Sequence, residues 1–196
     1  MALTANKIIL PDGAPVAGKQ LTKSSVMGSA NLMNIGWWNY DDSVTAGTPI
    51  NIPGTLTDVQ LTNSGLGPQT TEAFKPFGAT VPIWNSTTNE FDFSGLPVGA
   101  MVDLRLNYSV TTSGPTQLVI VEMDFAIGSV SNFQLLINET SHRSAGVHNA
   151  TRFTGFYIGS TDLQNFPTHI HCRSDATATV VVQGWYIKAT YPHVEV

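Results

Sequence analysis

Apolar and polar residues alternate along the second half of the chain. In residues 101–111 every second position is apolar, namely Val102, Leu104, Leu106, Tyr108 and Val110. Residues 117–127 repeat the pattern with Val119, Val121, Met123, Phe125 and Ile127. Because successive side chains of a strand point to opposite faces, this period of two gives each strand one dry and one wet face. The pattern predicts long antiparallel strands, each with one side against a core.

Shorter strand-like runs, separated by turn-forming residues, fill the rest of the chain beyond the first 33 residues. We predict further strands at residues 35–40, 49–53, 57–61, 81–85, 90–93, 133–137, 152–158, 166–172 and 177–191. Prolines at 49 and 53 favour a sheet edge for the run between them, and Gly155 is predicted to mark a bulge. No window has a helical period longer than about two turns.

About ten antiparallel strands in one domain predict two sheets packed face to face. An immunoglobulin-like sandwich fits less well, because the chain is too long for one such domain and has no Cys…Trp…Cys framework. We therefore predict an all-β, antiparallel jelly-roll sandwich over residues 34–196.

Residues 1–33 do not follow this pattern. Proline and glycine interrupt them, and the only strand-like piece is Lys7-Ile8-Ile9-Leu10. Three lysines (Lys7, Lys19 and Lys23) against one aspartate give this segment a net charge of +2. Because such a segment has little core of its own, we predict an extended N-terminal arm for docking and assembly. Its expected contact residues are Lys7, Ile8, Ile9, Leu10, Lys19 and Lys23.

Composition narrows the partners of the protein. Charged residues make up 12% of the 196 residues, hydrophobic residues 42%, and the net charge is −5. Without a basic stripe, nucleic acid binding is not expected. Cys172 is the single cysteine, which precludes an intrachain disulfide and fits a reducing cytoplasm. The start lacks the pattern of a signal peptide, and there is no apolar run of about 18 residues, so we expect a soluble protein with no membrane contact.

Two adjacent tryptophans indicate an interaction surface. Trp37 and Trp38 lie in the predicted strand at 35–40, where neighbouring side chains point to opposite faces. Both cannot face one core, so one of them is expected to contact a partner or the arm. Tryptophan is enriched in such contacts.

His169 and His171 are the sharpest candidate for a metal site. Residues two apart on a strand share a face, about 6–7 Å apart, and two imidazoles there could hold a metal. Cys172 would point to the opposite face, so further ligands would have to come from elsewhere, such as His142 or His148. Paired polar side chains on a wet strand face are the alternative that we favour, and we predict no cofactor.

Catalytic patterns are weak. Glu122 and Asp124 share a strand face and could act as the carboxylate pair of a glycosidase, but paired acids on an open face are usually only solvated. Asp41-Asp42 could bind calcium but lacks a spaced carboxylate loop, so a turn cap is expected. There is no Gly-x-Ser-x-Gly nucleophile motif. We predict a protein that is not an enzyme.

From about Ile83 onward, the chain resembles the TNF/C1q-like jelly roll found on bacteriophage virion proteins. The resemblance lies in Ile83-Trp84-Asn85, in the stretch from Asn89 to Arg105, and in Val180-Val181-Val182-Gln183-Gly184-Trp185-Tyr186-Ile187. It is a pattern of hydrophobic and turn residues. It implies a homotrimer that serves as a capsid decoration protein, a fibre head or a tail-spike knob.

Two functions follow from this resemblance. In the first, the protein is a homotrimeric decoration (cement) protein, made in the host cytoplasm, whose arm attaches to the major capsid protein or another virion protein. In the second, it is a fibre-head domain that binds a host surface glycan through exposed loops such as 62–80 and 141–149. A depolymerase built on Glu122 and Asp124 is the least favoured reading.

Overall fold

The computed structural model describes residues 33–76, 79 and 82–192. Residues Ile35–Tyr191 form one compact unit. The described residues Met33, Asn34 and Pro192 fall outside this unit. The arm residues Lys7, Ile8, Ile9, Leu10, Lys19 and Lys23 lie outside the described residues, so the predicted arm stays a prediction.

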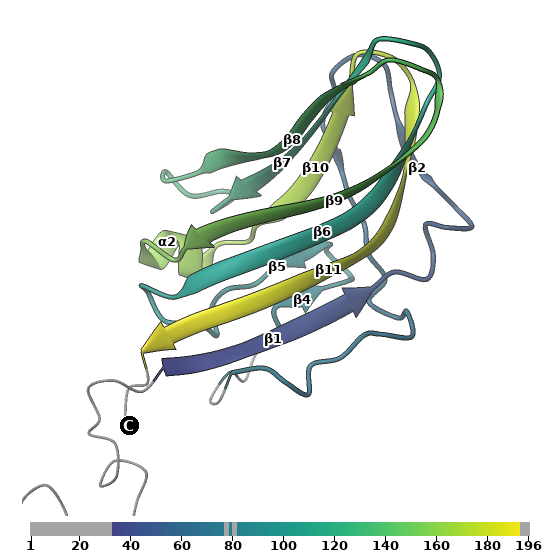
Figure 1. The fold of residues 1–196 in the computed structure, drawn as a ribbon. Coiled ribbons are helices and arrows are strands. Elements are labelled where there is room, and N and C mark those ends of the chain that lie inside the picture. The colour runs from purple at the N-terminus through teal and green to yellow at the C-terminus, as the bar shows by residue number, and fades with distance from the viewer. Residues whose placement is uncertain (1–32, 77–78, 80–81, 193–196) are drawn as a thin grey trace, which may run out of the picture. The chain divides into compact units, whose positions relative to one another are not determined.

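The described residues form strands and one short helix (Figure 1). The strands are β1 (Met33–Asp41), β2 (Ile50–Ile52), β3 (Val59–Gln60), β4 (Trp84–Asn85), β5 (Glu90–Phe91), β6 (Met101–Thr112), β7 (Gln117–Phe125), β8 (Phe133–His142), β9 (Gly146–Tyr157), β10 (His169–Ser174) and β11 (Ala178–Pro192). The helix, α2 (Thr161–Asn165), has five residues. No helix in the described ranges is long and apolar enough to cross a membrane.

The strands form two main sheets. One has the order β1-β11-β6-β9, with β2 paired to β11, and the other has the order β3-β10-β7-β8. The small β4-β5 pair stands apart from both. Along the chain, β6, β9 and β11 belong to the first sheet, and β7, β8 and β10 to the second. Strands that cross repeatedly between two antiparallel sheets in this way make a jelly roll, which confirms the predicted all-β jelly-roll sandwich.

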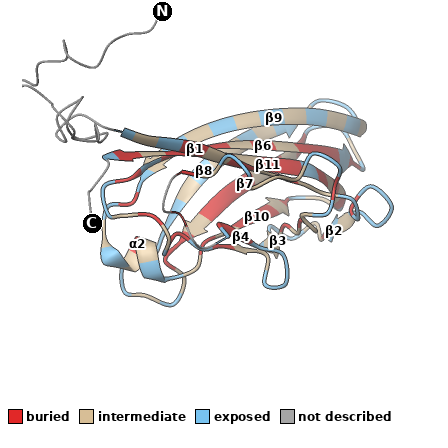
Figure 2. Cartoon of the chain, turned by 90° about the horizontal axis from the view of Figure 1, so that it is seen from below, coloured by how far each residue is buried: buried red, intermediate tan, exposed pale blue. Residues whose placement is uncertain are grey.

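Alternating side chains of the long strands build the core between the sheets. All five apolar positions singled out in β6 are buried, and so are Val119, Val121, Met123 and Phe125 of β7. Trp38 and Trp185 are the largest fully buried side chains. Figure 2 shows the buried residues concentrated on β6, β7, β10 and β11, whereas β9 is exposed or intermediate along its length. Each fully buried leucine or valine contributes about 1.5–3 kcal/mol to this core.

Two sequence predictions about β9 are wrong. The strand begins at Gly146, so the predicted loop 141–149 shrinks to residues 143–145. The bulge predicted at Gly155 is absent, because the register with β6 runs unbroken from Tyr157 to Gly146. A Cβ atom at residue 155 would stand 3.3 Å from Asp103 Oδ1 of the neighbouring strand. The glycine therefore makes room for a side chain and does not bend the strand.

The strand predicted at 166–172 begins later, at His169. Residues 161–165 form α2, whose N-terminus is capped by the Ser160 hydroxyl, which accepts from the N–H of Leu163. Pro167 then follows without a backbone N–H to donate to a sheet. Strand pairing with β7 starts only after this proline.

Candidate functional site

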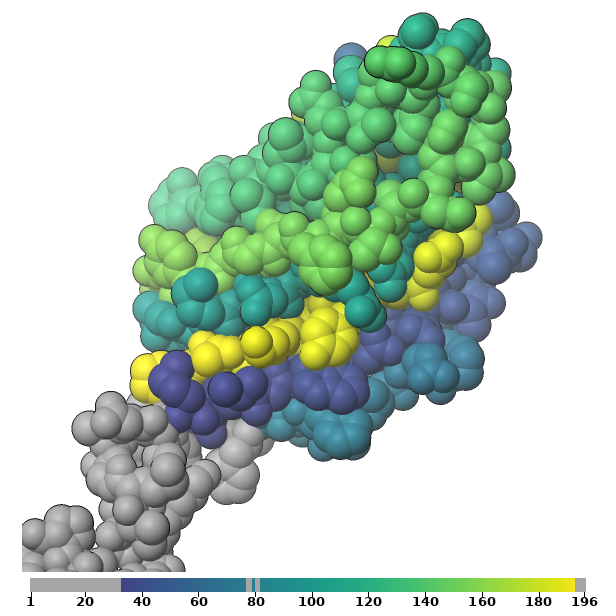
Figure 3. All heavy atoms as spheres, viewed as in Figure 1, coloured from purple at the N-terminus to yellow at the C-terminus, as the bar shows by residue number. Residues whose placement is uncertain are grey.

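The outer face of the β1-β11-β6-β9 sheet, which is turned toward the viewer in Figure 3, carries exposed apolar side chains. Phe153 is 75% exposed and Tyr157 62%, both on β9, and Ile35 on β1 is 61% exposed. Met101 and Val147 extend the set. These residues form the apolar face: Ile35, Met101, Val147, Phe153 and Tyr157. A folded protein seldom leaves a run of large apolar side chains in water unless something binds there.

Trp37 and Trp38 point to opposite sides of β1, as their adjacency requires. Trp38 is buried in the core, whereas Trp37 is partly buried on the outer side. The Trp37 ring stacks on Phe74 at 4.6 Å between centroids and on Tyr186 at 5.5 Å. Side chains of the same chain therefore cover part of Trp37, and its predicted contact with a partner or the arm stays a prediction.

An open hollow of about 550 Å³ lies beside Trp37. Its aromatic lining is Trp37, Phe74 and Tyr186. Its polar lining comes from β1, from residues 68–71 and from one arginine, and includes Asn39, Asp41, Gln69 and Arg105. The Arg105 guanidinium stands 5.0 Å from the centre of the Tyr186 ring, within the range of a cation–π interaction. Aromatic faces next to amide and carboxylate groups suit a ligand with both apolar and hydroxyl-bearing surfaces.

Asp42 closes the turn after β1. Its Oδ2 accepts hydrogen bonds from the backbone N–H groups of Val44 and Thr45, and its Oδ1 accepts one from Ser64 N–H. Burial alone would raise the pKa of Asp42, but these hydrogen bonds, chiefly that from Ser64, lower it below its ordinary value. The carboxylate caps a turn, as the sequence predicts.

A cluster of charged side chains lies on the outer face of the other sheet. On strands β10 and β7, His169 stands opposite Asp124, and His171 stands opposite Glu122. The two histidines share one face, with ring centroids 6.0 Å apart. Cys172, between His171 and Arg173, points the other way and is buried in the core. Burial raises the pKa of its thiol to about 12, which keeps the sulfur protonated and unreactive near neutral pH.

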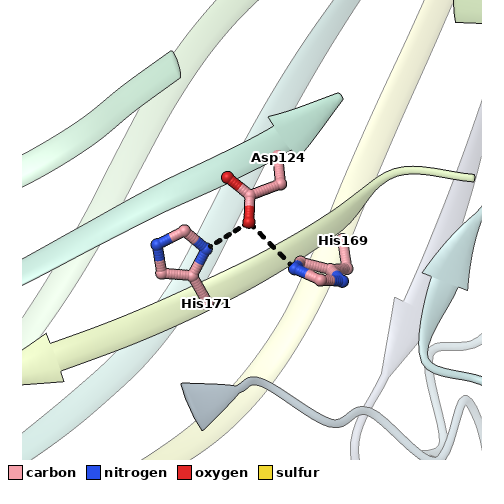
Figure 4. A group of neighbouring side chains, drawn as sticks. All are labelled: Asp124, His169 and His171. Atoms are coloured by element: carbon pink, nitrogen blue, oxygen red, sulfur yellow. Dashed lines mark hydrogen bonds and ion pairs between the residues drawn. The ribbon is translucent and has the colours of Figure 1, made fainter. Parts of the chain in front are cut away.

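Asp124 joins the two imidazoles (Figure 4). Its Oδ2 lies 3.0 Å from His169 Nε2 and 3.0 Å from His171 Nδ1. His171 is only 1% exposed, whereas His169 and Asp124 are each exposed by about a fifth of their side chains. The two histidines, which the sequence places on a wet strand face, are therefore partly enclosed by protein.

The other edge of His171 meets two more carboxylates. Its Nε2 lies 3.3 Å from Glu122 Oε2 and 3.3 Å from Asp58 Oδ1. Arg173 in turn reaches Glu122 Oε2 at 2.7 Å and Asp58 Oδ1 at 3.5 Å. Three carboxylates, two imidazoles and one guanidinium thus form the charged cluster: Asp58, Glu122, Asp124, His169, His171 and Arg173.

The structure changes the set of ligands that the sequence proposed around the histidines. His142 and His148 stack on each other at 4.1 Å between centroids, and His148 Nε2 contacts Thr112 Oγ1 at 3.1 Å. The group that contacts both His169 and His171 is Asp124, a residue whose place in the sequence indicates only a carboxylate pair with Glu122. Arg173 could have been found from the alternation of β10, whereas Asp58 could not, because strand pairing alone brings it there.

The known proteins that are similar to this chain are solved structures of low sequence identity. No family model matches the chain, and no curated protein matches it. Among solved structures it is similar to Eiger TNF from S. frugiperda, with 9% identity over 83% of this chain and 96% of that chain and a TM-score of 0.44. The PRD1 vertex protein P5 has 12% identity, coverage of 82% and 97%, and a TM-score of 0.37.

A third similar structure is the CBM22-2 xylan-binding domain of Xyn10C from Paenibacillus barcinonensis. It has 10% identity, coverage of 77% of this chain and 98% of that chain, and a TM-score of 0.39. The jelly-roll assignment rests on the strand order of the chain itself.

Proposed function

We propose that this protein is a non-enzymatic structural protein of a bacteriophage virion, a homotrimer that decorates the capsid and attaches through residues 1–33. The observation that carries the proposal is the apolar face, with Phe153 and Tyr157 largely exposed on one strand. The resemblance of residues from Ile83 onward to phage jelly-roll proteins supplies the trimer and the virion setting.

The apolar face suits burial against a second copy of the chain. Interface centres are enriched in aromatic residues, and Phe153 and Tyr157 supply two. Three charged side chains stand beside them: Arg105 pairs with Phe153 across the strands, and Lys188 and Asp103 approach each other to 3.8 Å. Arginine is itself enriched at interfaces, and the Lys188–Asp103 contact brings opposite charges together.

The test is the oligomeric state of the full chain. Light scattering coupled to size exclusion is expected to give a trimer for the wild type and smaller species for Phe153→Ser. Leu66→Ser is the matched control, because Leu66 is 78% exposed and lies in the loop between β3 and β4, outside the set of residues that defines the apolar face. A wild-type monomer at micromolar concentrations, or a trimer unaffected by Phe153→Ser, would contradict the proposal.

Attachment is tested separately from assembly. Changing Lys7, Lys19 and Lys23 together to Glu reverses the charge of the proposed arm. We expect this variant to remain trimeric and to bind purified phage heads less well in co-sedimentation, and deletion of residues 1–33 to abolish binding. Undiminished head binding by the deletion variant would exclude the arm as the attachment segment.

Glycan binding is a second candidate function, favoured by the hollow beside Trp37. Three aromatic rings and nearby amide and carboxylate groups line it, and part of the lining comes from loop 62–80. Wild-type protein applied to a glycan array should then bind a defined sugar, and Trp37→Ala should lose that binding while staying trimeric. An array without signal for the wild type would remove this candidate.

A further inference from the structure

Three potential metal ligands converge on the outer face of the β3-β10-β7-β8 sheet. Asp124 Oδ2 stands 3.0 Å from both His169 Nε2 and His171 Nδ1, and the ligand atoms of the three residues all lie within 4.8 Å of one another. Figure 4 shows the carboxylate between the two rings. Zinc binds imidazole nitrogen and carboxylate oxygen at about 2.0–2.2 Å in a tetrahedron. Ligand atoms around such an ion stand a little over 3 Å apart, close to the two distances from Asp124 Oδ2 to the imidazole nitrogens.

Two buried polar atoms of this group lack hydrogen bonds. His171 Nδ1 makes none despite its short distance to Asp124, and neither does Asp124 Oδ1. His171 is almost fully buried. Buried polar atoms are nearly always satisfied in folded proteins, and a cation between Asp124 and His171 would satisfy both residues.

The surroundings of His171 orient it as a ligand. Its Nε2 lies within hydrogen-bonding distance of Glu122 Oε2. A proton on Nε2 that is donated to this carboxylate leaves the Nδ1 lone pair directed toward Asp124. Ligating histidines in metalloproteins commonly have this partner, because a carboxylate on the far nitrogen fixes the tautomer and raises the basicity of the ligating one.

Arg173 distinguishes this group from a second one. Asp58, Glu122 and His171 also bring three ligand atoms together. However, Arg173 already lies 2.7 Å from Glu122 and 3.5 Å from Asp58, and its positive charge opposes a cation there. Within the described part of the chain, no arginine makes an ion pair with Asp124.

We propose that Asp124, His169 and His171 bind one divalent transition metal ion per chain, with Zn²⁺ the best fit. Two imidazoles and one carboxylate favour such an ion over Mg²⁺ or Ca²⁺, which take oxygen ligands. Asp124 and His169 also line an open hollow of about 450 Å³ with Asn132, Phe133 and Gln134. Water can reach a fourth coordination position from that side. The ion would tie β10 to β7 and stabilise the sandwich.

The alternative needs no metal. The short contacts of Asp124 with the two imidazoles would then be direct hydrogen bonds or ion pairs. The two arrangements differ in an observable way, because only the metal site gains stability when Zn²⁺ is added.

The experiment uses the full chain, freed of metal with a chelator and dialysed. Calorimetric titration with Zn²⁺ is expected to give one site per chain and a higher midpoint of thermal unfolding, and Mg²⁺ should give neither. His169→Ala and Asp124→Asn change partly exposed residues and should fold, as circular dichroism will show. We expect each to weaken Zn²⁺ binding by at least about tenfold.

His142→Ala with His148→Ala is the matched control, because it removes the other adjacent histidine pair and should leave the site intact. Co²⁺ bound to the wild type gives a second measurement, since its visible absorption reports tetrahedral ligation without any substitution. The proposal is overturned if the wild type binds no Zn²⁺, if binding survives both His169→Ala and Asp124→Asn, or if only the control variant loses it.

Discussion

The outer faces of the two sheets differ in the side chains that they expose to solvent. On the β3-β10-β7-β8 sheet, the members of the charged cluster contact one another, with Arg173 against Glu122 and Asp124 between two histidines. On the β1-β11-β6-β9 sheet, the side chains of Phe153 and Tyr157 are largely exposed to water. The polar groups of the first face meet partners mainly within one chain, whereas the apolar groups of the second gain most from another molecule.

This difference indicates that the charged cluster contributes to folding stability and that the apolar face contributes to association between molecules. Loss of one partner in an enclosed ion cluster leaves a charge that water cannot reach, so the cost appears in folding. Loss of an exposed aromatic ring removes little from the folded monomer and acts on assembly. The ion pairs of the two faces, Arg173–Glu122 and Lys188–Asp103, allow the contrast to be measured directly.

The largest effect is expected for Arg173→Met. The substitution leaves Glu122, whose side chain is 11% exposed, without its guanidinium partner, and we expect a loss of about 3 kcal/mol in the free energy of unfolding. Urea denaturation in the presence of a chelator measures it. Adding Glu122→Leu to Arg173→Met should restore part of the loss, because both charges are then absent.

Lys188→Met is the control on the other face. Lys188 and Asp103 are 3.8 Å apart and well exposed, so the change should cost no more than about 0.5 kcal/mol. Labelling of Cys172 gives an independent readout, because its thiol is buried on β10 and should react only when that strand opens. Equal labelling rates in Arg173→Met and Lys188→Met would show that the two faces do not differ as described.

An intermediate effect is expected for Asp42→Asn, at the turn that follows β1. Backbone N–H groups, and not positively charged side chains, donate hydrogen bonds to the Asp42 carboxylate. Loss of the carboxylate cap should cost about 1 kcal/mol at pH 7.

The pH dependence follows from the lowered pKa of Asp42. Because the pKa is lower in the folded than in the unfolded state, the stabilisation is complete above the unfolded value of about 3.9. It is lost as the pH falls through the folded value. Urea denaturation between pH 7 and pH 2.5 should therefore show the gap between wild type and Asp42→Asn closing in acid, and a constant gap would contradict the assignment.

The smallest effect on folding is expected for Phe153→Ser. In dilute solution its free energy of unfolding should lie within about 0.5 kcal/mol of the wild-type value. At higher concentrations the wild-type unfolding midpoint should rise through mass action while that of the variant stays constant. Scanning calorimetry over a hundredfold range of concentration tests this. Parallel behaviour of the two proteins would place the association surface elsewhere.

Several parts of this structure could be predicted from the sequence because they depend on local alternation. The inward residues of β6 and β7 and the opposite directions of Trp37 and Trp38 follow from a period of two, and the edge position of β2 follows from the prolines that flank it. Local signals were less reliable at boundaries. The sequence around Gly155 predicts a bulge, but the structure has none there. The glycine instead leaves space for the Asp103 side chain on a neighbouring strand.

The sequence predicted which residues of the charged cluster share a strand face, but not which strands lie next to each other. Spacing placed His169 and His171 on one face, and Glu122 and Asp124 on one face of another strand. Their partnership depends on the pairing of β10 with β7, which a period of two does not encode. The same holds for Asp58, which reaches His171 only through the arrangement of the sheets.

The sequence by itself determined that this chain is built of strands and which side chains each strand turns inward, since both depend on neighbours along the backbone. Tertiary structure alone decided which strands lie side by side, and therefore that one outer face brings charged side chains into contact while the other presents aromatic rings to solvent. The physical reason is that sheet order and register arise from contacts between residues distant in the chain, and no local period records those contacts.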